Sequence, residues 1–446
     1  MASRMGFLAS ATFAVVGGSV PVQVADNTTS PKGVAAPFDF FSAPYGGEGQ
    51  AFFSGSAGAA SGLWSAKLNG AAPPGAVVPL VQVGVQKLPG TQEPIKEIGA
   101  AAGDTDSMVF FAEGASPASA QIMGAAPSSA NPDKTYGVVN LETRSPDGGR
   151  FQFLTPGGLG VANKGGTVVF HAVTSLGSKG LFVAQTEGHV ASPKWTITKI
   201  VDNSTKMPIP GDHLFADTED QVIGLTPDGS RTVFFGSNDI NARTGNQRTG
   251  VFEWVRDEAE GAGGGTISCI ANSNDTKVPL PRSSGNPPWI LQGFGGITVA
   301  NDGSVCFMAE AVNGVQPPVV GIFCRFGTDG KLQRMADSLM KIPGGHDPSG
   351  NPTDFQYVDY PSLSPDASTV VFQGNDDGGR RGVYSAQPAS GGGGGTLKKL
   401  FDWQDKINEQ TVFNIQMNFG SFDGVYVSFF IAWANTNEGI YSLSIF

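Results

Sequence analysis

A seven-fold internal repeat constrains the fold of this chain more than any other feature. Each repeat has a turn rich in Asp and Gly, a run of β-branched residues and Phe, a loop, and usually a Gly followed by apolar residues. Two examples are "NKGGTVVFHAVTSLGSKGLFVAQ" and "PDASTVVFQGNDDGGRRGVYSAQ". One Phe anchors each run, and these are Phe53, Phe111, Phe170, Phe235, Phe307, Phe372 and Phe430. Successive anchors are 58, 59, 65, 72, 65 and 58 residues apart, a regular period with loops of variable length.

Each repeat also contains a strand before the turn, such as "DFQYVDYPSLS", and most contain another after the Gly segment, such as "TLKKLFD". Four short strands repeated seven times predict an all-β fold, a seven-bladed β-propeller with four-stranded antiparallel blades. A blade buries its faces only against its neighbours, so a closed ring of blades has one continuous core. We expect a single domain over residues 19–446. Residues 1–18 are expected to be an N-terminal extension or the remnant of an export segment.

The composition fits many strands joined by tight turns. The 446 residues include 63 Gly and 30 Pro, and only 15% are charged. A net charge of -11 without a basic stripe predicts no nucleic-acid partner. No run of 18 apolar residues occurs, so no transmembrane segment is expected. No motif indicates a cofactor.

Family resemblance supports the propeller. The stretch "LSPDASTVVFQGNDDGGRRGVYSA" resembles the "SPDG…aFxSnxDG…iY" repeat of TolB-like, WD-type β-propellers. "VANDGSVCF" and "GGEGQAFF" are similar, with departures, to the repeats of bacterial propellers known by an N-x-x-G-x-x-A-F motif. The resemblance spans nearly the whole chain. It implies the fold and not an activity, because such propellers serve as enzymes, scaffolds and binding modules.

The segment "VPVQVADNTTSP" near the N-terminus recurs later as "KIVDNSTKMP", "CIANSNDTKVP" and "RMADSLMKIP". Each copy is an outer strand followed by an Asx turn and a Pro. The last repeat ends one strand short, so we expect the N-terminal strand to complete it and to remove an exposed sheet edge. The turn residues are Asp26, Asp202, Asn272, Asp337 and Asp402, for which calcium ligation is an alternative. Asp228, Asp302 and Asp366 are expected to form the hairpin turns.

Three cysteines are too few for a disulfide scaffold. Cys306 and Cys324 lie in consecutive predicted strands, so a cross-strand disulfide is possible in an oxidising compartment. We expect buried free thiols instead.

Two polar loops between second and third strands are candidate ligand sites. The loop of the fourth repeat contains Asn238, Asp239 and Arg243. The loop of the sixth repeat contains Asn375, Asp376, Asp377, Arg380 and Arg381. Carboxylates, amides and guanidinium groups together can bind a glycan through bidentate hydrogen bonds. The alternative is that these loops are solvated tips with local Asx turns and surface ion pairs.

The inner strands line the channel and add Asp359 to the candidate ligand-binding residues. An enzyme acting on polysaccharides would need a base and an Arg, for which His213, Tyr360 and Arg380 are the available types. No two His have the spacing of metal ligands, and His171 is expected to pack within its blade.

The main functional prediction is a non-catalytic binding or structural propeller outside the cytoplasm, in an extracellular, periplasmic or cell-surface location. It would engage a glycan or protein partner through its polar loop face. The alternatives are a polysaccharide lyase or hydrolase with its site at the channel mouth, and a subunit of a larger surface assembly.

Overall fold

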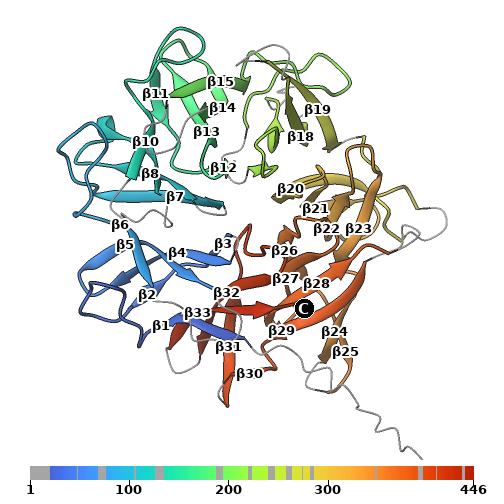
Figure 1. The fold of residues 1–446 in the computed structure, drawn as a ribbon. Coiled ribbons are helices and arrows are strands. Elements are labelled where there is room, and N and C mark those ends of the chain that lie inside the picture. The colour runs from blue at the N-terminus through green and yellow to red at the C-terminus, as the bar shows by residue number, and fades with distance from the viewer. Residues whose placement is uncertain are drawn as a thin grey trace, which may run out of the picture.

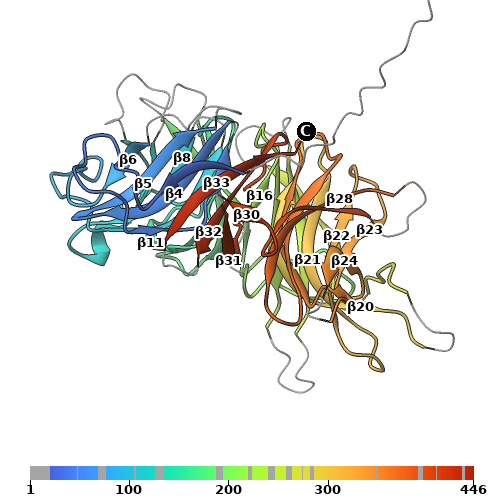
Figure 2. The ribbon, with the colours of Figure 1, turned by 90° about the horizontal axis from the view of Figure 1, so that it is seen from below.

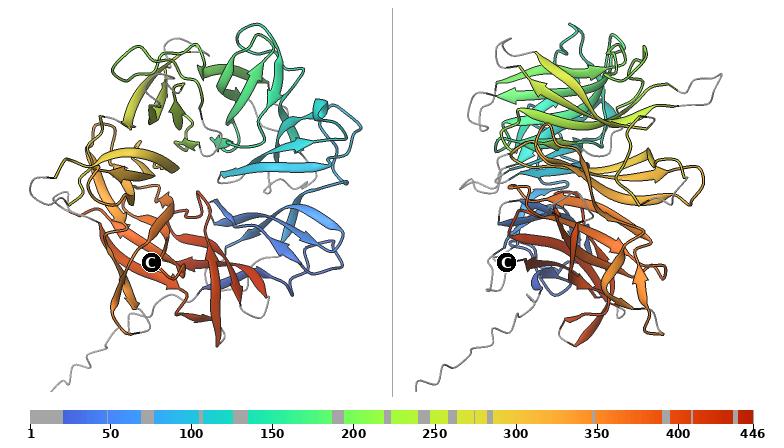
Figure 3. Two further views of the ribbon diagram at one scale, coloured as in Figure 1. Left: turned by 180° about the vertical axis from the view of Figure 1, so that it is seen from behind. Right: turned by 90° about the vertical axis from the view of Figure 1, so that its right-hand side faces the viewer.

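In the computed structural model the described residues form seven antiparallel sheets arranged as blades around a central axis (Figure 1). The described residues are 21–445 except 48, 69–76, 105–106, 126–134, 187–193, 219–222, 240–246, 258–263, 274, 282–285, 347–348, 390–394, 408 and 434–436. The blades follow one another round the ring in chain order (Figure 1). Their strands cross the thickness of the ring, so connections lie on two opposite faces (Figure 2, Figure 3). The predicted seven-bladed propeller is confirmed.

The first four blades follow one plan, from an inner strand at the axis to an outer strand at the rim. Blade 1 has β2 (Phe40–Phe41) and β3 (Tyr45–Gly47), both paired with β4 (Gln50–Ala57), then β5 (Ala60–Lys67) and β6 (Val78–Gln82). Blade 2 has β7 (Glu97–Asp104), β8 (Ser107–Glu113), β9 (Gln121–Ala125) and β10 (Thr135–Asn140), with a 3-10 turn at Pro117–Ser119. Blade 3 has β11 (Phe151–Leu154) and β12 (Gly160–Ala162), both paired with β13 (Thr167–Thr174), then β14 (Lys179–Thr186) and β15 (Trp195–Asp202). Blade 4 has β16 (Gly224–Leu225), β17 (Arg231–Ser237), β18 (Thr249–Arg256) and β19 (Gly265–Asn272).

The remaining blades keep this plan, with an added hairpin between blades 5 and 6. Blade 5 has β20 (Ile290–Val299), β21 (Val305–Val312), β22 (Val319–Arg325) and β23 (Leu332–Asp337). The hairpin consists of β24 (Lys341–His346) and β25 (Pro352–Asp354). Blade 6 has β26 (Tyr357–Leu363), β27 (Val370–Asn375), β28 (Arg381–Gln387) and β29 (Thr396–Asp402). Blade 7 has β30 (Lys406–Ile407), β31 (Gln410–Gln416), β32 (Tyr426–Trp433), β33 (Glu438–Ser444) and β1 (Val22–Asp26).

The N-terminal strand closes the ring. β1 pairs antiparallel with β33, with Val22 opposite Ser442 and Asp26 opposite Gly439. Ala25 is fully buried in this strand. The predicted closure of the last blade is therefore confirmed. The predicted extension over residues 1–18 lies outside the described residues.

The anchoring Phe side chains form the core between blades. All seven lie in the second strand of their blade, and none is more than 9% exposed. Phe111 of blade 2 and Phe170 of blade 3 belong to one buried cluster, so neighbouring blades share their apolar faces. Full burial of a Phe stabilises a fold by about 1.5–3 kcal/mol. Each repeat of the sequence therefore corresponds to one blade, and its anchoring Phe packs in the core between blades.

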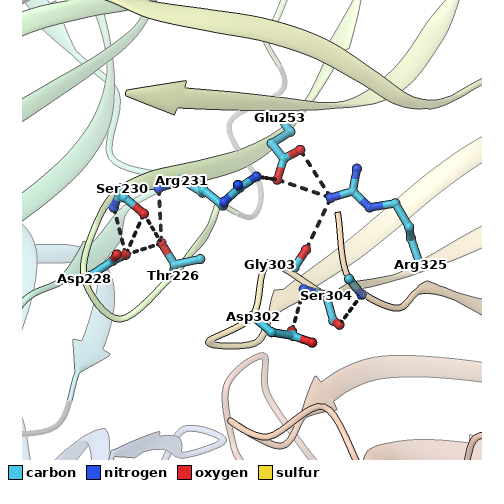
Figure 4. Close-up of polar contacts among 10 residues, drawn as sticks. Thr226, Asp228, Ser230, Arg231, Glu253, Asp302, Gly303, Ser304 and Arg325 are labelled. Atoms are coloured by element: carbon cyan, nitrogen blue, oxygen red, sulfur yellow. Dashed lines mark hydrogen bonds and ion pairs between the residues drawn. The ribbon is translucent and has the colours of Figure 1, made fainter. Parts of the chain in front are cut away.

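The two faces of the ring differ in their connections. One face, here called the turn face, carries the hairpin turns from first to second strand. There Asp366 accepts hydrogen bonds from the Ser364 hydroxyl at 2.6 Å and the Ser368 N–H at 3.1 Å. Asp228 is held in the same way by Thr226 and Ser230, and Asp302 accepts from the Ser304 N–H (Figure 4). The predicted role of these Asp residues in turns is confirmed.

The opposite face, here called the loop face, carries the second-to-third loops and the connections between blades. The predicted Asx turns occur there. Each of the five Asp or Asn side chains accepts a hydrogen bond from a backbone N–H two or three residues later; they are Asp26, Asp202, Asn272, Asp337 and Asp402. Because these oxygens already serve backbone amides, their recurrence is explained by turn geometry.

Cys306 and Cys324 form a disulfide, which corrects the expectation of free thiols. They are directly opposite each other in the pairing of β21 with β22, with 4.1 Å between their Cα atoms. Both are fully buried. Cys269 is a free thiol.

Candidate functional site

The channel contains a cavity of about 580 Å³ that lies toward the turn face. All seven blades contribute to its wall, which is mainly apolar side chains and backbone, including Leu159, Ile223, Ile297 and Phe422. Its lining includes residues of the first-to-second-strand hairpins, such as Pro365, and these hairpins lie on the turn face. None of the predicted site residues lines it. Those that the structure describes all lie on the loop face.

The fourth-blade candidates mostly hold their own loop in place. The Arg248 N–H donates to Asn238 Oδ1 at 2.6 Å, and the Asn238 N–H donates to the Arg248 carbonyl at 3.0 Å. Asn238 Nδ2 lies 3.3 Å from His213 Nδ1. Asp239 is exposed, and Arg243 lies outside the described residues. The hydrogen bonds of Asn238 therefore hold the two ends of the loop together.

The sixth-blade loop repeats this arrangement in what we call the outer cluster, Asp376, Arg380 and Trp403. The Arg380 N–H donates to Asp376 Oδ1 at 3.0 Å, and its Nε donates to Asp376 Oδ2 at 2.7 Å. The guanidinium carbon lies 4.2 Å from the centre of the Trp403 ring. The Asp376 side chain is 2% exposed. Asn375 donates to the Asp376 carbonyl and Asp377 is exposed, so Arg380 and Asp376 satisfy each other.

Toward the axis, blade 6 presents a second group of polar side chains, the inner cluster: Tyr357, Asp359, Tyr360, Arg381 and Asn414. Asp359 and Tyr360 lie on the loop-face half of β26, and Arg381 begins β28. Arg381 Nη1 donates to Asn414 Oδ1 of blade 7 at 3.3 Å. Among the described residues, neither Arg381 nor Asp359 forms an ion pair. These two charged groups are available to a ligand.

The backbone at Tyr360 is strained. Its φ is +51°, a left-handed conformation that a bulky residue rarely adopts. It occurs at a β-bulge, where Asp359 pairs with Gln373 but Ser362 pairs with Val371. Blade 5 has a bulge at the matching place, and there the residue is Gly296, with φ +55°. Strain of this kind concentrates at functional sites.

The electrostatics of the inner cluster reflect partial burial. Burial raises the pKa of Asp359, and the Tyr360 N–H, which donates to its Oδ1 at 2.7 Å, opposes that rise. Burial, Asp359, Tyr360 and Glu310 together raise the pKa of Tyr357 to about 12. Burial and Asp359 raise the pKa of Tyr360, while Arg381 lowers it. Perturbed groups in one place are typical of binding and catalytic sites.

The structure brings some predicted residues together and separates others. Asp359, Tyr360 and Arg381 share the inner cluster, whereas no described contact joins His213 to Tyr360 or Arg380. The Tyr360 ring instead packs on Phe419, with 4.9 Å between ring centres. His171 is buried and lies 3.1 Å from the Thr218 hydroxyl, as expected of a packing residue.

Sequence reasoning missed Asn414, Glu310 and Trp403. Asn414 comes from blade 7 and Glu310 from blade 5, so no pattern within the sixth repeat indicates them. Trp403 directly follows the outer-strand Asp402 of the sixth repeat, and that position alone could have suggested a contact with the loop.

Exposed apolar side chains gather on the loop face. Ten large apolar or aromatic residues among those described are exposed, and all but Val425 lie on second-to-third loops, blade connections or the loop-face ends of inner strands. The nine are Phe40, Val85, Phe153, Leu176, Leu214, Val315, Leu339, Tyr357 and Phe413. They are distributed around the ring from blade 1 to blade 7.

Within the described part of the chain, no group of three or more His, Cys, Asp or Glu is placed to hold a metal ion. No helix in that part is long and apolar enough to cross a membrane.

Comparison with known proteins finds matches of low sequence identity among solved structures. No family model and no curated protein matches the chain. Among solved structures, TolB from Acinetobacter baumannii is 12% identical over 73% of this chain and 57% of its own, with a TM-score of 0.34. An ancestral GH74 enzyme is 12% identical over 96% of this chain and 51% of its own, with a TM-score of 0.46. The BP39L lectin from Burkholderia pseudomallei is 14% identical over 91% and 95%, with a TM-score of 0.40.

The chain thus spans little more than half the length of the first two of these structures. Two TolB structures are among the matches. These similarities assign no activity to this chain.

Proposed function

We propose that this protein is a non-catalytic binding propeller outside the cytoplasm, and that its inner cluster holds a glycan on the loop face. The observation that carries the proposal is the contrast within blade 6. Arg380 and Asp376 neutralise each other, whereas Arg381 and Asp359 have no charged partner among the described residues.

The residue types of the inner cluster suit a sugar. A carboxylate can accept two hydroxyl groups, and a guanidinium donates bidentate hydrogen bonds to hydroxyl or carboxylate oxygens. Tyr357 is 37% exposed, and its ring offers an apolar face with a polar edge. The strained backbone at Tyr360 supports a role for its side chain, because a Gly there would remove the strain.

Two further observations support the proposal. Most of the exposed large apolar side chains among the described residues lie on the loop face, the same face as the inner cluster. The buried disulfide Cys306–Cys324 is of the kind that persists in oxidising compartments, in keeping with a location outside the cytoplasm.

A glycan array tests the proposal, with wild type beside a Tyr357→Ala, Asp359→Asn double variant. A polysaccharide-degradation assay of the same proteins separates binding from catalysis. We expect wild type to bind a defined set of glycans without cleaving them, and the double variant to lose at least about tenfold in affinity, or about 1.4 kcal/mol.

The unfolding midpoint of the variant should stay near the wild-type value at neutral pH, because removing the half-buried Asp359 charge offsets the loss of the partly exposed Tyr357 side chain. Absence of glycan binding in wild type would refute the glycan proposal. Cleavage that the double variant loses would replace it with the enzyme alternative.

A further inference from the structure

A second site lies on the side of the ring, away from the inner cluster. A groove of about 480 Å³ separates the outer parts of blades 4 and 5. Its apolar wall comes from Ile270, Val278, Pro279 and Leu332. Its charged residues are all cationic; they are Lys277, Arg325 and Lys331. In a chain of net charge -11, a groove whose described lining holds three cations and no carboxylate is unusual.

Arg325 is the buried charged residue of this groove, and its position is fixed by hydrogen bonds. Its residue is only 8% exposed, and its Nη2 lies 3.2 Å from both carboxylate oxygens of Glu253 and 3.2 Å from the Gly303 carbonyl. Glu253 also receives Arg231 Nη1 at 3.0 Å, so two guanidinium groups share one carboxylate (Figure 4). The trio carries two positive charges and one negative charge, with Arg325 and Glu253 buried and Arg231 partly exposed, so it keeps a net positive charge beside the groove.

The donor capacity of Arg325 is also incomplete. Its buried Nε has no hydrogen-bond partner among the described residues. Lys277 and Lys331 are exposed at the mouth of the groove, and neither forms an ion pair with a described residue. The uncompensated charge of the trio therefore adds to that of two free ammonium groups.

We propose that this groove is a binding site for a doubly charged oxyanion, a phosphate or sulfate group, either free or carried as an ester. Lys277 and Lys331 bind the anion directly, and Arg325 supplies positive potential from the groove wall. The site is independent of the inner cluster and of any glycan bound there.

Calorimetric titration tests the site with sodium sulfate and sodium phosphate, against sodium chloride at equal ionic strength. The test variant is Lys277→Gln, Lys331→Gln. The matched control is Lys206→Gln, Lys341→Gln, which changes the net charge equally at two exposed lysines paired with Asp212 and Asp354. Because all four lysines are exposed, both variants should keep the wild-type unfolding midpoint.

We expect saturable one-site binding of sulfate or phosphate by wild type, at least about tenfold weaker in the test variant and within about twofold in the control. Glucose 6-phosphate and glucose 6-sulfate then identify which ester the site prefers, and saturable binding of either supports the proposal. Absence of saturable anion binding, equal binding of chloride, or equal weakening in the control would overturn it.

Discussion

Blade 6 places two arginines side by side in sequence and gives them opposite environments. In the outer cluster, Arg380 is held by a buried carboxylate and an indole ring. In the inner cluster, Arg381 donates to the neutral Asn414, Asp359 accepts the Tyr360 N–H, and neither forms an ion pair with a described residue. Charged groups that form an ion pair with each other stabilise the loop, whereas charged groups without such a partner are available to bind a ligand. The proposed binding residues of this face are therefore those without an ion-pair partner among the described residues, and polarity alone does not select them.

The largest effect on stability should come from the outer cluster. Asp376→Ala leaves the Arg380 guanidinium and two loop amides without their acceptor. Removing one partner of a buried ion pair costs 3–5 kcal/mol, and because Arg380 is partly exposed we expect about 2–3 kcal/mol. Urea unfolding measures this. The matched control Asp377→Ala, at an exposed neighbour, should change stability by less than about 0.5 kcal/mol. Equal effects of the two substitutions would contradict the assignment.

The bulges of blades 5 and 6 sharpen the comparison. A Cβ at Gly296 would lie 2.4 Å from Phe419 Cε1, so Gly296→Ala should destabilise by about 1–3 kcal/mol.

Tyr360→Gly relieves about 1–2 kcal/mol of left-handed strain but loses the Phe419 contact and gains chain entropy in the unfolded state. We expect these terms to cancel to within about 1 kcal/mol in thermal unfolding, while glycan binding is lost. A strongly destabilised Tyr360→Gly would indicate a structural role for the ring.

The two Asp residues at opposite ends of the first hairpin of blade 6 should differ in the sign of their pH effect. Hydrogen bonds from Ser364 and Ser368 lower the pKa of Asp366 below 3.8. Its ionised form therefore stabilises the fold above that pH, and the contribution is lost as the pH falls through the lowered pKa. Burial raises the pKa of Asp359 above 3.8, so the folded state favours its protonated form and loses stability as the pH rises through that raised pKa.

Unfolding of the two Asn variants across pH 3–7 measures this difference. At neutral pH, Asp366→Asn should be less stable than wild type and Asp359→Asn more stable. Both differences should shrink toward acid pH. The same sign for both variants would show that Asp359 is satisfied in the fold.

The fold could be predicted because its determinants are local and repeated. The seven Phe anchors and the Asp turns occur within single repeats, and the strand absent from the last repeat has its counterpart near the N-terminus. The disulfide was harder, because spacing alone does not fix that Cys306 lies directly opposite Cys324.

The site was predictable only in part. Sequence placed Asp359, Tyr360 and Arg381 among the candidates, but it could not distinguish Arg380 from Arg381. That distinction depends on Asn414, which is 33 residues further on and in another blade, and on Trp403 packing beneath one guanidinium and not the other. Which polar group is already satisfied is a property of tertiary contacts.

The central claim is that the inner cluster binds and the outer cluster stabilises. A glycan array of Arg381→Ala beside Arg380→Ala, each with its free energy of unfolding, tests it most directly. We predict that Arg381→Ala loses at least about tenfold in binding with less than about 1 kcal/mol of stability. Arg380→Ala should bind within about twofold of wild type and lose about 1–2 kcal/mol. The reverse pattern, with binding lost in Arg380→Ala and kept in Arg381→Ala, would contradict the account.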